Sequence, residues 1–115
     1  MHNVISRQDV GKRHSIMNNN DKRLVKRLCG ALNDDNRMEI VSMLFLEEMN
    51  ASQIVEKVAV GQSTVSYDMK ILVDSGLVKC RKQEKHKYYS INKEMLKEIL
   101  RLSEMVKKQL DLEEE

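Results

Sequence analysis

The feature that most limits how this chain can fold is a change of hydrophobic period at Gly76. Before it, from Gln62 to Ser75, apolar residues recur with the spacing of a helix, and after it, from Leu77 to Ile91, they alternate with polar ones. Glycine readily adopts the left-handed conformation that ends a helix. The alternating stretch predicts two short strands around a polar, charged tip at 83–86. A helix followed at once by a β-hairpin is therefore expected.

Four further helices are predicted around this unit. The first begins at Asp21, and its apolar face holds Leu24, Val25, Leu28, Ala31 and Leu32. The second follows the polar break at 33–36 and is apolar enough to lie in the core through Met38, Ile40, Val41, Leu44 and Phe45. Asn50 and Gln53 predict a capping box for the third, which ends in a tight turn at 59–61. Asn92 caps a long last helix.

This order of elements predicts a mostly α (α+β) fold, a winged helix-turn-helix of about five helices with a two-stranded β-hairpin wing. With 115 residues, one compact domain is expected at 21–112, after a flexible arm at 1–20 and before an acidic tail at 113–115. The chain has no apolar run of membrane-spanning length and no secretory signal pattern. We therefore expect a cytoplasmic protein with no membrane partner.

The charges are unevenly distributed along a chain whose net charge is only +2. Residues 28–61 carry two basic and six acidic side chains, whereas residues 62–90 carry six basic and three acidic ones. A basic patch of this kind attracts polyanions. The alternative is a solvated surface on which the charge is uneven for no functional reason.

One side of the helix at 62–75 carries small and planar hydrogen-bonding groups. At 100° per residue, Val65, Met69 and Leu72 share the core side, and the opposite side is polar. Glutamine can pair with adenine, hydroxyl groups suit phosphates or bases, and lysine suits phosphate or guanine. The predicted DNA contacts on this helix are Gln62, Ser63, Thr64, Ser66, Tyr67 and Lys70. Taken singly, Ser63 or Thr64 could equally cap the helix.

The hairpin adds a second group of predicted DNA contacts. They are basic or imidazole side chains at or near its tip: Arg81, Lys82, Lys85, His86 and Lys87. Asp68 does not suit a DNA surface, and it projects away from the centre of the polar side of its helix. We expect it to pair with a neighbouring lysine or arginine; if it faced the groove, it could accept from a cytosine amino group.

The stretch "GQSTVSYDMKILVDSGLVKCRKQEKHKYYSI" resembles the core of the ArsR family of small bacterial winged-helix repressors. That family has Ser-Gln-Ser-Thr-Val-Ser-His-His-Leu-Lys, then a Gly-Leu-Val turn and a wing that ends in Tyr-Tyr. Upstream, "ALNDDNRMEIVSML" resembles the family's Ala-Leu-Ala-Asp-Pro-Thr-Arg-Leu-Arg-Ile-Leu. Gly61, Tyr67, Asp68 and Asp35 depart from the pattern. The resemblance covers about residues 24–110.

The resemblance implies a homodimer built on the first and last helices. Both helices have apolar stripes wider than a small domain alone needs to bury. The residues expected in the dimer interface are Leu24, Leu28, Met95, Ile99, Leu102 and Val106. The alternative is that the last helix only covers the core of its own chain.

Metal binding is not expected at the two sites that the family uses. One site needs a Cys-x-Cys pair where this chain has Asn50 and Ser52, which supply no thiolate. The other needs carboxylates and histidines on the last helix, where this chain has Lys93, Met95, Val106 and Gln109. No cofactor is expected. Cys29 and Cys80 are interpreted as small buried hydrophobic residues, with a thiol switch as the alternative.

The pattern as a whole favours a dimeric, sequence-specific transcriptional repressor that binds double-stranded DNA at a pseudo-palindromic operator. The alternative is a winged-helix module that binds proteins and not DNA, supported by Asp68 and the small net charge. The sequence shows no Ser/His/Asp or Cys/His set and no glycine-rich phosphate loop, so we do not expect an enzyme. The sequence does not identify an inducer or an operator.

Overall fold

The computed structural model describes residues 15–111, which form five helices and a three-stranded sheet. The helices are α2 (Asn19–Leu32), α3 (Asp35–Leu44), α4 (Ala51–Val58), α5 (Gln62–Ser75) and α6 (Lys93–Leu110). The strands are β1 (Met49–Asn50), β2 (Val78–Gln83) and β3 (His86–Ile91). The predicted winged-helix fold is confirmed. Among residues 15–111, no helix is both long and apolar enough to cross a membrane.

Short polar side chains set the beginnings of four of the five helices, α2, α3, α4 and α6. Asn50 accepts a hydrogen bond from the Gln53 amide, and the Gln53 side chain accepts one from the Asn50 amide, both at 2.8 Å. This capping box and the Asn92 cap of α6 are confirmed. The predicted start of the first helix at Asp21 is wrong by two residues, because Asn18 is the cap and its side chain accepts from the Asp21 amide at 2.8 Å. The rest of the predicted arm, 1–14, and the tail lie outside the described residues.

The sheet contains one more strand than the sequence predicted. β2 and β3 form the hairpin, hereafter the wing, and β1 pairs antiparallel with the other edge of β3, with Met49 opposite Tyr89. A two-residue strand is too short to show an alternating pattern, and its partner lies far away in sequence, so local reasoning missed it. This pairing ties the wing to the segment before the helix-turn-helix.

The core is formed by one face of each of the helices α2, α3, α4 and α5 and by the base of the wing. Ile40, Ile54 and Leu72 are fully buried. The prediction that Met38 and Phe45 lie in the core is wrong, because these side chains are 47% and 57% exposed. They lie seven residues apart, on the side of α3 opposite Ile40. The helix is apolar on both sides, but only the side that carries Ile40 is buried.

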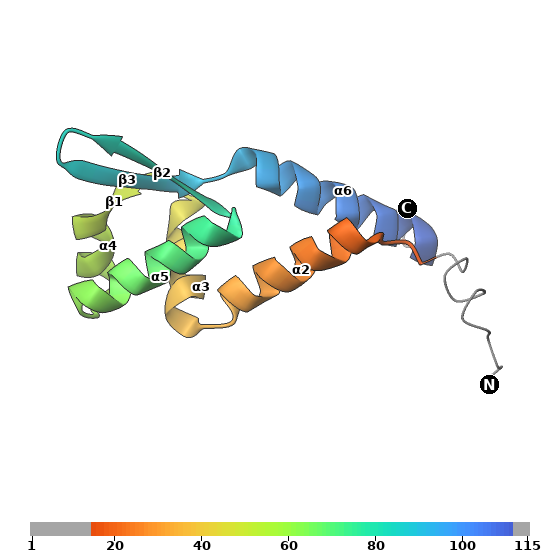
Figure 1. Cartoon of the computed structure of the whole chain (residues 1–115), viewed down its shortest axis with the longest axis horizontal. Helices are drawn as coiled ribbons and strands as arrows, with labels where there is room; N and C mark the ends of the chain where they lie inside the picture. Colours follow the sequence, from red (N-terminus) through yellow and green to blue (C-terminus); the bar gives the residue numbers. More distant parts are fainter. Residues whose placement is uncertain (1–14, 112–115) are drawn as a thin grey trace.

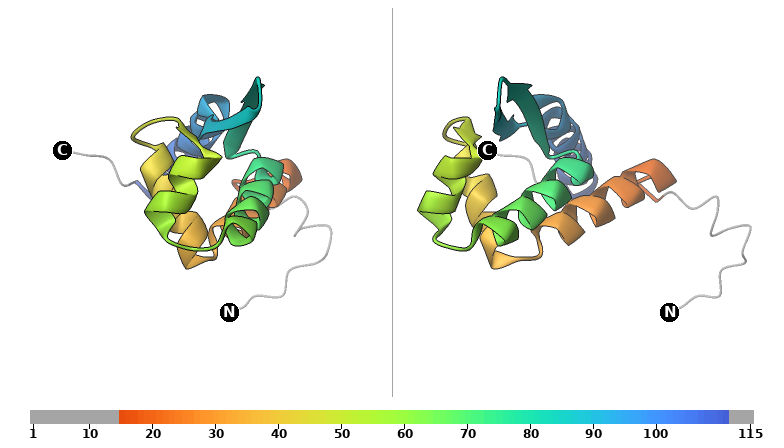
Figure 2. Two further views of the ribbon diagram at one scale, coloured as in Figure 1. Left: turned by 90° about the vertical axis from the view of Figure 1, so that its left-hand side faces the viewer. Right: turned by 60° about the vertical axis from the view of Figure 1, so that its left-hand side comes forward.

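The arrangement separates two ends of the molecule. In Figure 1, the wing, α4 and the start of α5 lie at one end, and α2 and α6 run together towards the other. An ion pair between Asp21 of α2 and Arg101 of α6, at 2.8 Å, joins the two helices there. The views of Figure 2 place α5 below the wing, and α5 contacts α2, α3, α4 and β2.

Candidate nucleic-acid interface

The helix α5 buries the apolar side that its sequence predicted. Val65 and Met69 are each 2% exposed, and Leu72 is fully buried. This orientation leaves the opposite side in solvent. We call that side the outer face; it consists of Gln62, Ser63, Thr64, Ser66, Tyr67 and Lys70, all of which are exposed. The structure therefore brings together on one surface all six of the side chains of this helix that were predicted to touch DNA.

The beginning of α5 has no side-chain cap. Its N-cap residue is Gly61, and the structure shows no capping hydrogen bond from a side chain. Within the described chain, the hydroxyl groups of Ser63 and Thr64 are not used to cap their own helix, which was the alternative role for them. A helix beginning with unsatisfied amide groups favours a bound anion such as a phosphate.

Asp68 is the one acidic residue of α5 that points inwards. It is 3% exposed, and its Oδ1 accepts a hydrogen bond from the Arg37 guanidinium at 3.1 Å. The prediction that Asp68 pairs with a basic neighbour is confirmed. Its charge is therefore matched inside the domain and does not oppose an anion at the outer face.

The turn between α5 and the wing is fixed by Gly76. Its φ is +91°, in the left-handed region, and a Cβ there would lie 2.8 Å from the Met95 side chain. The side chains of Arg27 and Asn92 donate to the carbonyl oxygens of Ser75 and Gly76 at 3.0 and 2.8 Å. The predicted glycine stop is confirmed, and these bonds fix the direction in which the wing leaves the helix.

Two lysines face each other across the wing. Lys82 on β2 is directly opposite Lys87 on β3, both are exposed, and within the described chain neither forms an ion pair. Like charges placed directly opposite each other on neighbouring strands are destabilising. An anion bound between them would relieve that repulsion. Lys85, at the exposed tip, adds a third cation.

Arg81 points to the other face of the wing, because side chains alternate along a strand. Its guanidinium binds both carboxylate oxygens of Glu48, at 2.9 and 3.1 Å, and lies 4.6 Å from the centre of the Tyr88 ring. The hydrogen bond from Arg81 lowers the pKa of Glu48 below its ordinary value of 4.5. His86 lies beside Tyr88, with ring centroids 6.3 Å apart. The structure thus separates Arg81, whose charge Glu48 balances, from the lysines of the wing.

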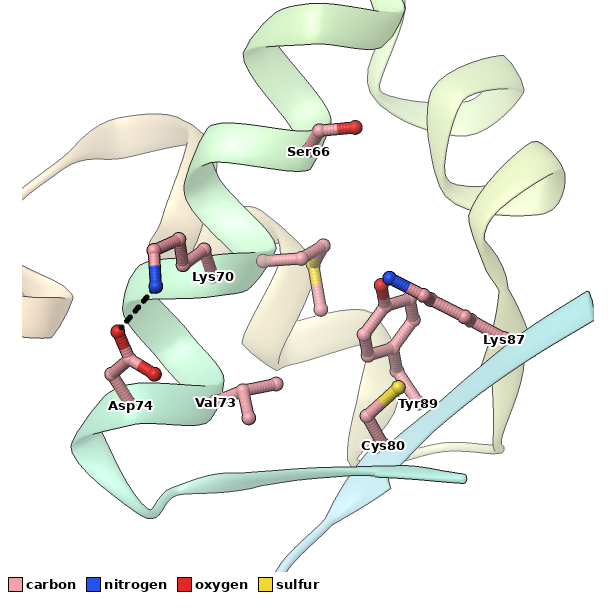
Figure 3. A pocket seen from close by; sticks show the side chains of 8 residues that line it. Ser66, Lys70, Val73, Asp74, Cys80, Lys87 and Tyr89 are labelled. Carbon is pink, nitrogen blue, oxygen red and sulfur yellow. Dashed lines mark hydrogen bonds and ion pairs between the residues drawn. The ribbon is translucent and has the colours of Figure 1, made fainter. Parts of the chain in front are cut away.

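A groove of about 370 Å³ runs between α5 and the wing (Figure 3). Its walls are Ser66, Met69, Lys70, Val73 and Asp74 from α5, and Cys80, Lys87 and Tyr89 from the wing. Lys70 forms an ion pair with Asp74 at 3.2 Å. Burial raises the pKa of the Tyr89 phenol, so this group stays neutral at physiological pH. The groove joins the outer face of α5 to the lysine pair of the wing.

Cys80 and Tyr89 line this groove, and sequence reasoning did not place them there. The signal was the strand alternation, which puts Cys80 on the same face as Lys82 and, through the hairpin register, opposite Tyr89. The interpretation of Cys29 and Cys80 as buried residues is wrong, since both thiols are exposed. Cys29 lies on the solvent side of α2, and Cys80 faces the open groove.

The residues predicted for the dimer interface differ in exposure. Leu28 and Leu102 are each 8% exposed, so they are buried inside their own chain. Burial within one chain does not test a contact with a second copy, so the place of Leu28 and Leu102 in a dimer interface stays a prediction. Val106 is 36% exposed, while Leu24, Met95 and Ile99 are half-buried. Leu100 and Leu110 of α6 are 64% and 60% exposed, which leaves an apolar surface on this helix.

The structure offers no cluster of metal ligands within residues 15–111. No three histidine, cysteine, aspartate or glutamate side chains there are grouped so that they could hold a metal ion. Asn50 and Ser52 lie at the beginning of α4, where the side chain of Asn50 forms part of the capping box.

Comparisons with known proteins agree with this geometry. The family model for the bacterial regulatory protein, arsR family, matches residues 34–79, from the cap of α3 to the start of β2. The chain is 36% identical to the arsenical resistance operon repressor of Staphylococcus aureus over 69 residues, which are 60% of this chain and 66% of that protein. The match thus spans just under two thirds of that relative's length.

Two solved structures share the fold. HlyU from Vibrio cholerae is 26% identical, with a TM-score of 0.62 over 75% of this chain and 97% of that one. A winged helix-turn-helix DNA-binding domain from Mycobacterium bovis, homodimeric in solution, has 21% identity and a TM-score of 0.61 over 81% and 87% of the two chains. The family model, the curated relative and the fold agree on one assignment. This chain belongs to the ArsR family of bacterial regulatory proteins, which are transcriptional regulators and not enzymes.

Proposed function

We propose that this protein is a transcriptional repressor that binds a pseudo-palindromic operator in double-stranded DNA as a homodimer. The observation that carries the proposal is the groove between the outer face of α5 and the wing. On one side it has exposed polar groups suited to bases, and on the other an opposed lysine pair suited to phosphate.

The roles of the side chains follow from their positions. Gln62 and Tyr67 stand out from the first two turns of α5, where recognition helices meet base edges, and Ser66 lines the adjoining groove. Ser63 and Thr64 lie at the uncapped helix beginning and suit a phosphate oxygen. The remaining contacts are with phosphate, through Lys70, Lys82, Lys85, His86 and Lys87. Arg81 supports the wing through Glu48 and has a smaller part in binding.

The dimer is supported by the apolar surface of α6. Leu100, Val106 and Leu110 are exposed, and such a surface on a small domain marks an interaction site. The Mycobacterium bovis domain with this fold is a homodimer. We propose that Leu24, Met95 and Ile99, which are half-buried, extend the same interface. Two copies then present two α5 helices to successive turns of the major groove.

The proposal is tested by selecting bound sequences from random duplex DNA and then measuring affinity at increasing salt. Expected are two half-sites about one helical turn apart and a steep linear fall of log affinity with log salt, by about 0.9 for each phosphate contacted. The competing hypothesis, a module that binds only proteins, predicts neither sequence enrichment nor salt-dependent binding. A monomer without duplex affinity at low salt contradicts the proposal.

A further inference from the structure

Arg37 joins three helices at one point. Its Nε donates to the carbonyl of Ala31 in the last turn of α2 at 2.6 Å, and its amide donates to Asp34, the cap of α3, at 3.1 Å. Its Nη1 reaches Asp68 of α5 at 3.1 Å. The side chains of Arg37 and Asp68 are only 11% and 4% exposed. The guanidinium therefore ties α5 to the junction of α2 and α3.

Asp68 is held differently from the apolar side chains of α5, and a second arginine, Arg27, bonds the Ser75 carbonyl at the end of the helix. Val65, Met69 and Leu72 attach the helix through apolar burial, which has no preferred direction. The bond from Arg37 to Asp68 is directional and charge-assisted. Among the described residues, the second oxygen of Asp68, Oδ2, accepts no hydrogen bond. Within residues 15–111, the bond from Arg37 is thus the one hydrogen bond that orients this carboxylate.

Asp68 is adjacent to Tyr67, and the two side chains point to different sides of the helix. Tyr67 is 64% exposed on the outer face, while Asp68 is 3% exposed. Successive residues are about 100° apart around a helix, so the direction of Asp68 determines the direction of Tyr67. A small rotation of α5 would move the whole outer face relative to the wing.

We propose that Arg37 and Asp68 are positioning residues that set the rotation of α5 about its axis and so contribute to the choice of DNA sequence. This inference rests on the proposed DNA binding. Phosphate contacts from the lysines of the wing carry no sequence information and do not depend on this rotation. Loss of the ion pair therefore lowers discrimination between sequences more than it lowers affinity for unrelated DNA, which keeps the phosphate contacts of the wing.

Two variants of the full chain test the inference. Asp68→Asn keeps the shape of the side chain but removes its charge. The double variant Arg37→Met with Asp68→Leu replaces the whole pair by apolar groups, a change that is often neutral or stabilising for buried ion pairs. The control is Asp21→Asn, which also removes a buried carboxylate bonded to an arginine from a remote helix, but lies away from α5.

The measurement is the ratio of affinities for the selected duplex and a scrambled duplex, at a temperature where circular dichroism shows each variant folded and sedimentation shows the wild-type assembly. We expect the ratio to fall about tenfold in both test variants, comparable to the loss of one base contact, and to stay unchanged in Asp21→Asn. Affinity for the scrambled duplex should fall less than affinity for the selected duplex, because the wing lysines keep their phosphate contacts and neither test variant makes the net charge of the chain more negative.

The outcomes separate a failure of the proposed role of the ion pair from a failure of the proposed DNA binding. A double variant that keeps the wild-type ratio overturns the inference, and so does an equal loss in Asp21→Asn, which would show a general effect of destabilisation. If Asp68→Asn does not fold, the double variant decides by the same ratio. If the wild type itself does not prefer the selected duplex, the proposed function fails and not only the role of the ion pair.

Discussion

The helices α5 and α6 are both amphipathic, but they are buried to different degrees. α5 has 14 residues, of which Val65, Asp68, Met69, Leu72 and Ser75 are buried. α6 has 18 residues, of which only Leu102 is buried. α5 contacts three helices and a strand. α6 meets α2 through the ion pair of Arg101 with Asp21 and leaves large apolar side chains in solvent.

This difference indicates where each helix obtains its stability. α5 is held by its own chain, as a rigid platform for accurately placed contacts should be. The apolar side of α6 is only partly covered, so this helix gains further burial from a second copy under the proposed dimer. Changes in α5 should therefore act at every protein concentration, whereas changes in α6 should act through assembly.

The largest effect is expected in the core side of α5. Leu72→Ala removes a side chain that is fully buried, and the free energy of unfolding should fall by about 2–5 kcal/mol. Urea unfolding followed by circular dichroism measures this fall, which should be the same at all protein concentrations. Leu100→Ala on α6 is the comparison. Its side chain is 64% exposed, so the free energy of unfolding should fall by less than in Leu72→Ala. A cost below about 1 kcal/mol for Leu72→Ala would mean that α5 is not the platform inferred from its burial.

The next effect concerns the assembly of α6. In Leu100→Asp and Val106→Asp, a charge replaces an apolar group that the dimer would bury, at about 1.5–3 kcal/mol for each side chain. The dimer dissociation constant should rise at least about tenfold, as measured by sedimentation equilibrium. Tyr67→Ala is the matched control, since Tyr67 is also 64% exposed but lies on the outer face of α5. Unchanged assembly of both aspartate variants would place the dimer interface elsewhere.

A smaller effect on DNA affinity should distinguish the role of α5 from that of the wing. Gln62→Ala and Tyr67→Ala should change which sequences are preferred, each by about 1–3 kcal/mol. Lys82→Ala and Lys87→Ala should weaken binding to all sequences alike, and each should reduce the salt slope by about one if its lysine neutralises one phosphate. Filter binding or fluorescence anisotropy over a salt series separates the two. The assignment is reversed if the wing variants alter specificity and the α5 variants do not.

The smallest effect is expected from metals and arsenicals. The Staphylococcus aureus relative is an arsenical resistance operon repressor. Where the family resemblance implied a cysteine pair, this chain has Asn50 and Ser52, which supply no thiolate. Zinc, cadmium and arsenite at low micromolar levels should leave the affinity for DNA unchanged in the Cys29→Ser, Cys80→Ser double variant. A stoichiometric metal that lowers this affinity tenfold, about 1.4 kcal/mol of coupling, would reveal a further site.

Features set by local chemistry were predictable from the sequence. The caps at Asn50 and Asn92 and the stop at Gly76 depend on neighbouring residues, and all three are confirmed. The outer face of α5 followed from helical spacing. The roles assigned to its residues in binding DNA stay predictions.

Features that depend on distant residues were not predictable in the same way. The sequence indicated that Asp68 would find a basic partner, but Arg37 lies 31 positions away. Glu48 and Arg81 are 33 positions apart, and the two-residue β1 pairs with β3. Met38 and Phe45 have the same hydrophobic character as core residues, and only the packing of α3 shows that they are exposed.

The central claim is that the groove between α5 and the wing is the surface that binds DNA, and the two cysteines allow a direct test. Cys80 lines this groove, whereas Cys29 is exposed on α2. The measurement is the rate at which iodoacetamide alkylates each thiol, followed by mass spectrometry, with and without a saturating selected duplex at low salt. We expect the duplex to slow alkylation of Cys80 only, and high salt to restore its rate. Equal rates for Cys80 with and without bound duplex would contradict the claim.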